Sequence, residues 1–301
     1  MKKYLIYLSE RFPLQTHIPI IAIFSFSAIC YSLSAVGETE FIPLPYYALT
    51  FFLTFSLFLL LRISDEFKDH EDDMKYRKYL PVPRGLVTLN NLKWIGIGLV
   101  IAQIILVVLN LSFLPIYIIT MMYLALMFKE FFVEEWLKKH QIAYVFSHML
   151  IIPLVDLVAS SAHWSIAGIN PPTALGWFFA VSFFNGILLE IGRKIKLPEN
   201  EEEGVVSYSK LWGMKNAAYT WLVILGITLV LAFVAASAID SPNWVYILLT
   251  VFAIGGSITA FRFLSNPTQP KAKMIENAAG LWTMGMYLNL GALPFLVENI
   301  F

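Results

Sequence analysis

Long apolar runs, separated by short charged segments, constrain this chain more than any other feature. Hydrophobic residues make up 58% of its 301 residues and charged residues only 14%, whereas a water-soluble domain carries roughly a quarter charged residues. The apolar residues form continuous runs, most of them near the ~20 residues that a helix needs to cross a ~30 Å hydrocarbon core. The sequence therefore predicts an all-α membrane protein, a helical bundle around a central cavity, with a single domain over residues 1–301.

Nine of these runs are predicted to span the membrane. The fourth run is the shortest, and only a tight hairpin around residues 110–112 separates it from the third. The predicted spans are 17–36, 45–64, 91–111, 113–129, 141–160, 172–191, 216–238, 243–263 and 278–299.

The basic residues predict the orientation of these spans. If the chain crosses nine times, every Lys and Arg falls on the side of the N-terminus. Basic loops face the cytoplasm, so we expect a multi-pass protein of the cell (inner) membrane with its N-terminus inside and its C-terminus outside. The formal net charge of zero gives no indication of a nucleic-acid partner.

An acidic cluster follows the second span at the predicted cytoplasmic face. Asp65, Asp69 and Asp73 recur every four residues and so share one face of a helix. Carboxylates crowded at a helix C-terminus are unfavourable unless a cation lies between them. Mg²⁺ is a hard cation that binds both carboxylate and phosphate oxygens. This cluster therefore predicts a membrane enzyme that holds a magnesium-diphosphate substrate, although a solvated charged loop is the simpler alternative.

A second long cytoplasmic segment follows the sixth span. Glu190 closes that span, and an ionisable residue there usually faces a cavity. Arg193 and Lys194 come directly after it, and Lys210 lies further along the segment. These cations are candidates for binding a diphosphate, as is Arg84 in the first loop, but basic residues at this face also follow from the orientation rule alone. The acidic run 199–203 is either a second metal site or a solvated loop.

Inside the membrane, Asp156 and His148 lie eight residues apart on the fifth span and so near one face. An intramembrane carboxylate is costly and usually has a function. Asp156 either lines the cavity or bonds to a polar neighbour in the outer half of the bundle.

The chain resembles the UbiA superfamily of intramembrane prenyltransferases over essentially its whole length. Those proteins have nine membrane helices and aspartate-rich motifs after the second and sixth, the first of the form Asn-x3-Asp-x3-Asp followed by a Pro-rich, basic turn. This chain has Asp65, Asp69 and Asp73, then the turn Pro81-Val82-Pro83-Arg84-Gly85. Asp65 replaces the usual Asn, and the spaced aspartates of the second motif are absent.

The resemblance implies a Mg²⁺-dependent enzyme that ionises an isoprenyl diphosphate and transfers the prenyl group to a small lipophilic acceptor. It also implies a cavity that opens laterally to lipid. Asp65, Asp69 and Asp73 are the predicted metal ligands, with a second metal at Glu190 and one of Glu199, Glu201 or Glu202. The predicted diphosphate ligands are Arg84, Arg193, Lys194 and Lys210.

Two other functions remain open on the sequence. A terpene cyclase of the same superfamily would capture the cation with the substrate's own double bonds, and the altered second motif is compatible with this. A non-enzymatic transporter or lipid-binding protein is the other alternative, but few ionisable residues lie deep in the spans, which argues against an ion pathway.

Overall fold

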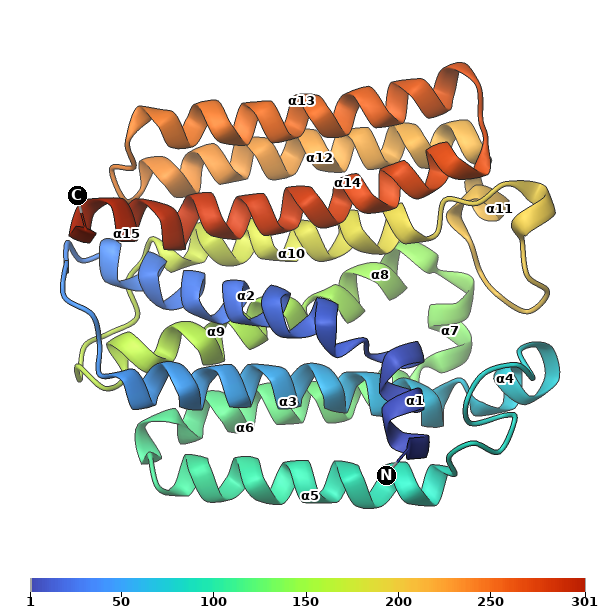
Figure 1. Ribbon diagram of the computed structural model, residues 1–301, viewed down its shortest axis with the longest axis horizontal. Helices are drawn as coiled ribbons and strands as arrows, with labels where there is room; N and C mark the ends of the chain where they lie inside the picture. Colours follow the sequence, from blue (N-terminus) through green and yellow to red (C-terminus); the bar gives the residue numbers. More distant parts are fainter. Residues whose placement is uncertain (1, 301) are drawn as a thin grey trace.

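The computed structural model describes residues 2–300 of the chain. Its elements are helices, with no strand in that range, and the long helices run side by side along the longest axis of the molecule (Figure 1). The predicted all-α fold class is confirmed. The apolar pattern explains this choice, because only helices satisfy every backbone polar group within one segment in a bilayer.

Nine helical segments within residues 2–300 are long and apolar enough to cross a membrane, as predicted. Three of them are interrupted, so that two or three elements form one span. The spans are α2 (Leu14–Ser34), α3 (Leu44–Lys68), α5 (Leu89–Val108), η1 with α6 (Leu111–Phe113, Leu114–Phe128), α8 with α9 (Gln141–Met149, Ile151–Trp164), α10 (Leu175–Arg193), α12 (Met214–Ser237), α13 (Asn243–Ser265), and α14 with η4 and α15 (Gln269–Tyr287, Leu288–Ala292, Leu293–Ile300).

The remaining helices are short and connect the spans. Figure 1 shows α1, α4, α7 and α11 at one end of the bundle, together with the N-terminus, while the C-terminus lies at the opposite end. The two segments predicted to carry the chemistry therefore lie at the same end. The short elements are α1 (Lys2–Arg11), α4 (His70–Tyr76), η2 (Glu130–Phe132), α7 (Glu134–Lys139), η3 (Pro198–Asn200) and α11 (Tyr208–Trp212).

Two helices extend well beyond the predicted ends of their spans. Helix α14 begins at Gln269 and not at residue 278, and α3 continues to Lys68 and not only to residue 64. Both extensions are polar, so a hydropathy argument misses them, yet the backbone hydrogen bonds of a helix continue regardless of what the side chains face. The extension of α3 carries Asp65 to the end of the bundle.

The first and last spans pack closely against each other. Helix α2 contacts α9 and also η4, a π-helical segment within the last span. A Cβ atom placed on Gly291 of η4 would lie 2.1 Å from the backbone oxygen of Ser27 in α2. Only glycine allows the two backbones to approach this closely.

Polar side chains join the central helices at a few points. The indole of Trp282 in α14 donates a 2.8 Å hydrogen bond to Oδ1 of Asn185 in α10. Asp156 of α9 is fully buried and accepts hydrogen bonds from Ser182 of α10 and, at 2.9 Å, from the hydroxyl of Tyr287. Asp156 therefore links three spans in the membrane interior. Of the two roles expected from the sequence, this is the one in which Asp156 bonds to polar neighbours.

Candidate active site

The acidic segment keeps its four-residue register across the junction of α3 and α4. The backbone amide of Asp69 donates to the backbone carbonyl oxygen of Asp65 at 2.9 Å. The backbone amide of Asp73 donates to the backbone carbonyl oxygen of Asp69 at 2.8 Å. Asp69 itself has φ −88° and ψ 5°, which separates the two helices by one turn residue. The helical hydrogen bonds thus continue through the junction and keep the three carboxylates in helical succession.

These three carboxylates differ in how strongly they are already paired. Asp73 is buried and forms an ion pair with Arg77, whose guanidinium also lies 4.0 Å from Asp69. The Asp65 and Asp69 side chains remain 41% and 39% exposed, and the ion-pair distance from Asp65 to Arg62 is 3.7 Å. Burial raises the pKa of both Asp69 and Asp73 above the ordinary value for aspartate. Asp65 and Asp69 are therefore the carboxylates available to a cation from outside the chain.

The second segment begins with a compact group of three charges. Glu190 lies in the last turn of α10, which ends at Arg193, and is only 6% exposed. One of its carboxylate oxygens lies 2.5 Å from Arg193, and the other lies 2.6 Å from Lys194. Spacings of three and four residues place these side chains on one face of the helix end, as the sequence predicts. Each oxygen of Glu190 is thereby bound to a protein cation.

The segment that follows α3 contacts the segment that follows α10. The hydroxyl of Tyr79 donates to Glu202 at 2.9 Å. Gly204 adopts φ +74° against the ring of Tyr76, at a point where any Cβ atom would clash. The loop after α3 and the loop after α10 therefore touch each other.

Arg84 pairs with Glu10 of α1 and not with the carboxylates of Asp65, Asp69 or Glu190. Its guanidinium donates to both oxygens of Glu10 in α1, at 2.7 and 3.0 Å, and to the backbone oxygen of Tyr79 at 2.8 Å. Arg84 thus fixes the loop against the N-terminal helix.

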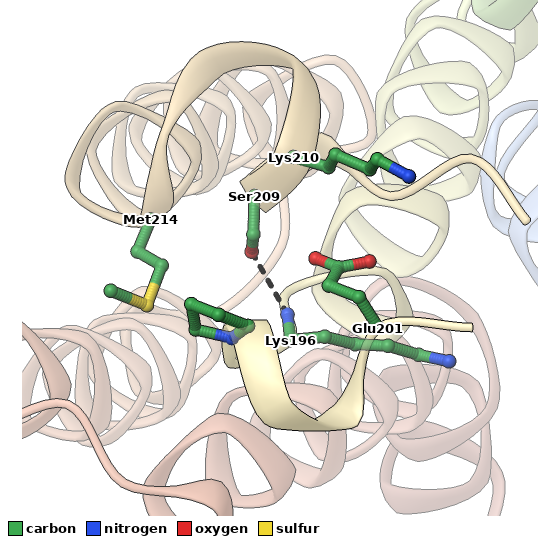
Figure 2. A pocket seen from close by; sticks show the side chains of 6 residues that line it. Lys196, Glu201, Ser209, Lys210 and Met214 are labelled. Atoms are coloured by element: carbon green, nitrogen blue, oxygen red, sulfur yellow. Dashed lines mark hydrogen bonds between the residues drawn. The ribbon is translucent and has the colours of Figure 1, made fainter. Parts of the chain in front are cut away.

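Glu201 and Lys210 line a separate pocket of about 310 Å³ in the second loop. Figure 2 shows both side chains there beside Lys196, whose backbone amide donates to the Ser209 hydroxyl at 2.9 Å. Within the loop, Glu201 also accepts a 2.5 Å hydrogen bond from Ser207.

The other members of the acidic run lie elsewhere in the same loop. Glu202 bonds to Tyr79 of the first loop, and Glu199 lies in the short helix η3.

A further charged cluster lies beside the acidic segment. The ammonium of Lys68, one residue before Asp69, lies 2.9 Å from the hydroxyl of Tyr144 and 3.0 Å from Glu130. Glu130 in turn lies 3.2 Å from Nε2 of His148. The position of Lys68 inside the acidic segment is a signal that sequence reasoning could have used. Glu130 offers no such signal, because its position depends on the conformation of the loop after α6.

The carboxylates fit one Mg²⁺ ion better than two. Within residues 2–300, no three His, Cys, Asp or Glu side chains converge closely enough to hold a metal by themselves. Asp65 and Asp69 are partly exposed and only loosely paired, and Mg²⁺ commonly takes one or two carboxylates and completes its shell with water and substrate phosphate. Glu190 does not fit a second ion, because Arg193 and Lys194 already bind both of its oxygens.

Comparison with known proteins places the chain in a family. No curated protein sequence is significantly similar to it. A solved structure reported in a study of digeranylgeranylglyceryl phosphate synthase in membranes has the same fold, with a TM-score of 0.67 over 99% of this chain and 100% of the other at 20% identity. The model of the UbiA prenyltransferase family matches residues 23–284. With that match over most of its length, and with paired charged segments at one end of nine spans, this chain belongs to the UbiA prenyltransferase family.

Proposed function

We propose that this prenyltransferase binds an isoprenyl diphosphate with Mg²⁺ at the cytoplasmic end of the bundle, ionises it, and transfers the prenyl group to a small lipophilic acceptor. The observation that carries the proposal is that two segments, one with partly exposed carboxylates and one with Arg193 and Lys194, contact each other at one end of the bundle. Asp65 and Asp69 offer partly exposed carboxylates, and Arg193 at the end of α10 is exposed as well. A magnesium diphosphate needs both kinds of group.

Asp65 and Asp69 are the residues that would hold the metal. When bound, Mg²⁺ would neutralise charge on the leaving diphosphate. Arg193 and Lys194 would bind the phosphate oxygens from the other side, and Glu190 would keep both cations in place. Fixed cations of this kind stabilise the negative charge that develops on the leaving group without reorganising during the reaction.

The chemistry needs a place where the allylic cation is protected from water. Near the end of α10 that carries Glu190, an apolar pocket of about 230 Å³ is lined by Phe146, Ile187 and Trp212, among others. Aromatic faces stabilise cations. An acceptor that enters this region from the bilayer would itself be lipophilic.

Asp69→Asn tests the metal-binding role. This change keeps the size of the side chain and removes its charge, so we expect it to abolish Mg²⁺-dependent pyrophosphate release from a prenyl diphosphate. The measurement is the rate of pyrophosphate release across a magnesium titration with purified protein. Asp72→Asn, on an exposed side chain in the same segment, is the matched control and should retain the parent rate.

Activity of Asp69→Asn within about threefold of the parent, which corresponds to ~0.65 kcal/mol, would exclude Asp69 as an essential ligand. Parallel reactions with and without lipophilic acceptors separate transfer from cyclisation, because only a cyclase releases a cyclic product from the diphosphate alone. A parent protein that releases no pyrophosphate from any prenyl diphosphate would contradict the proposal as a whole.

A further inference from the structure

We infer that Lys68 is a diphosphate-binding residue of this site and that Glu130 is the residue that positions it. The inference rests on the proposed function and adds a third cationic contact, supplied from the acidic segment itself. It stands on three observations: the place of Lys68 directly before Asp69, the buried contacts that hold it, and the backbone conformation that brings Glu130 to it.

Lys68 is the last residue of α3 and immediately precedes Asp69, one of the two carboxylates that would hold the metal. The Lys68 side chain is 18% exposed, so it is held at the surface of the site and not sealed within the bundle. A phosphate that reaches Asp69 through a metal comes next to this ammonium.

Two neighbours fix the direction of the Lys68 side chain. The ammonium lies 2.9 Å from the Tyr144 hydroxyl and 3.0 Å from Glu130. An ammonium has three N–H donors, so these two contacts leave one donor for a substrate oxygen. Glu130 is nearly buried, and burial alone would raise its pKa, but His148 and Lys68 hold the pKa of this carboxyl below its ordinary value. Glu130 therefore stays charged and keeps its hold on Lys68.

His148 is held against Glu130 from the other side. Nδ1 of His148 lies 2.9 Å from the backbone oxygen of Tyr144, which only accepts hydrogen bonds, so this nitrogen donates. Nε2 faces Glu130 at 3.2 Å. The ring also stacks on Tyr144, with centroids 3.9 Å apart. His148, Tyr144 and Glu130 thus form one rigid support behind Lys68.

The backbone around Glu130 adopts a left-handed conformation that is unfavourable for non-glycine residues. Glu130, Phe131 and Phe132 have φ angles of 47°, 53° and 59°, all in the left-handed region. Such angles are unfavourable for residues other than glycine and persist only where the surroundings impose them. The turn directs Glu130 to Lys68 and packs Phe131 against Tyr123 and His148, with centroids 5.5 and 5.8 Å apart. The turn therefore places the Glu130 carboxylate beside Lys68 and the Phe131 ring beside His148.

Binding of inorganic pyrophosphate in the presence of Mg²⁺, measured by calorimetry, tests the inference. We expect Lys68→Met to weaken binding about 10- to 100-fold, which corresponds to about 1.4–2.8 kcal/mol. Glu130→Gln should weaken it about 3- to 10-fold. In the Lys68→Met background, Glu130→Gln should have no further effect, because it acts only through Lys68. A purely structural role for Glu130 would instead give additive losses.

Matched controls come from the same loop. Glu134→Gln and Lys138→Met break an exposed ion pair of 2.7 Å and should leave pyrophosphate binding unchanged. Tyr144→Phe, which removes one hydroxyl and keeps the ion pair, provides a milder variant if Glu130→Gln does not fold, and it should weaken binding two- to fivefold. Unchanged affinity in Lys68→Met, or additive losses in the double variant, would overturn the inference. Absence of binding by the parent itself would instead contradict the proposed function.

Discussion

Glu190 lies where the sequence predicts it, but its contacts favour a role other than the predicted one of metal ligand. The sequence predicts a metal ligand at the end of the sixth span, and Glu190 does lie at the buried end of α10. Its two oxygens, however, contact Arg193 and Lys194. A carboxylate already neutralised by two cations attracts a further cation weakly. At this position the geometry favours a carboxylate that orients diphosphate-binding cations.

Lys194→Asp tests this interpretation, because it places a carboxylate where the aspartate-rich motif would have one. We expect weaker diphosphate binding, by ~1.5–3 kcal/mol for a lost hydrogen bond to a charged group, and repulsion between the new carboxylate and Glu190. The measurement is the Michaelis constant for pyrophosphate release over a magnesium titration. Lys215→Asp, on an exposed residue at the start of α12, is the control. A Michaelis constant that is unchanged or lower in Lys194→Asp would show that a second metal-binding carboxylate works here.

At the scale of elements, hydropathy predicted the number and the approximate position of the spans but not their internal breaks. The break between α8 and α9 at Leu150 and the π-helical segment η4 lie inside apolar runs. Hydropathy reports the transfer of side chains into lipid, and an apolar residue has the same transfer free energy in either backbone geometry. The polar ends of α3 and α14 were missed for the opposite reason: they are helical without being apolar.

Some contacts within the site were predictable from the sequence and others were not. The pairing of Glu190 with Arg193 and Lys194 follows from helical spacing and was predictable from the sequence. The contact between Lys68 and Glu130 joins α3 to a loop two spans later. This contact depends on three consecutive residues with left-handed backbone conformation, which no local sequence pattern predicts. Such a conformation costs roughly 1–2 kcal/mol per residue, so sequence propensity argues against the very turn that positions Glu130.

The close approach of η4 to α2 gives a prediction at this scale. Gly291→Ala would place a methyl group 2.1 Å from the backbone oxygen of Ser27, and backbone atoms cannot move aside as a flexible side chain can. We expect a loss of about 1–3 kcal/mol in stability, seen as a lower unfolding temperature in detergent. The control is Gly280→Ala in α14, where no atom lies within 4 Å of the added Cβ. That variant should be unchanged or more stable, by up to ~1 kcal/mol.

At the scale of the whole molecule, the bundle has two chemically different ends. The short helices α4 and α11, which follow the two charged helix ends, lie at one end of the bundle with α1, and the C-terminus lies at the other (Figure 1). The distribution of Lys and Arg along the chain predicts that the first end faces the cytoplasm. The proposed reaction would then draw its diphosphate from the cytoplasmic side.

Cysteine labelling tests this orientation. Single cysteines in place of Lys75 and Glu202 should be protected from an impermeant thiol reagent added to intact cells, whereas a cysteine in place of Asn170, an exposed residue in the loop after α9, should react. The native Cys30 is buried and so should give little background. Permeabilised cells, in which all three positions become accessible, control for reactivity. Labelling of the first two positions in intact cells would reverse the assigned orientation.

The contact between α2 and η4 also has a consequence for how the protein is made. A ribosome synthesises α2 well before η4, so the face of α2 that η4 covers has no partner until the ninth span has been made. That face includes Ser27, which is fully buried in the finished bundle. A chain that stops before the ninth span would leave this face open to lipid or to other proteins. The ninth span therefore completes the packing of α2.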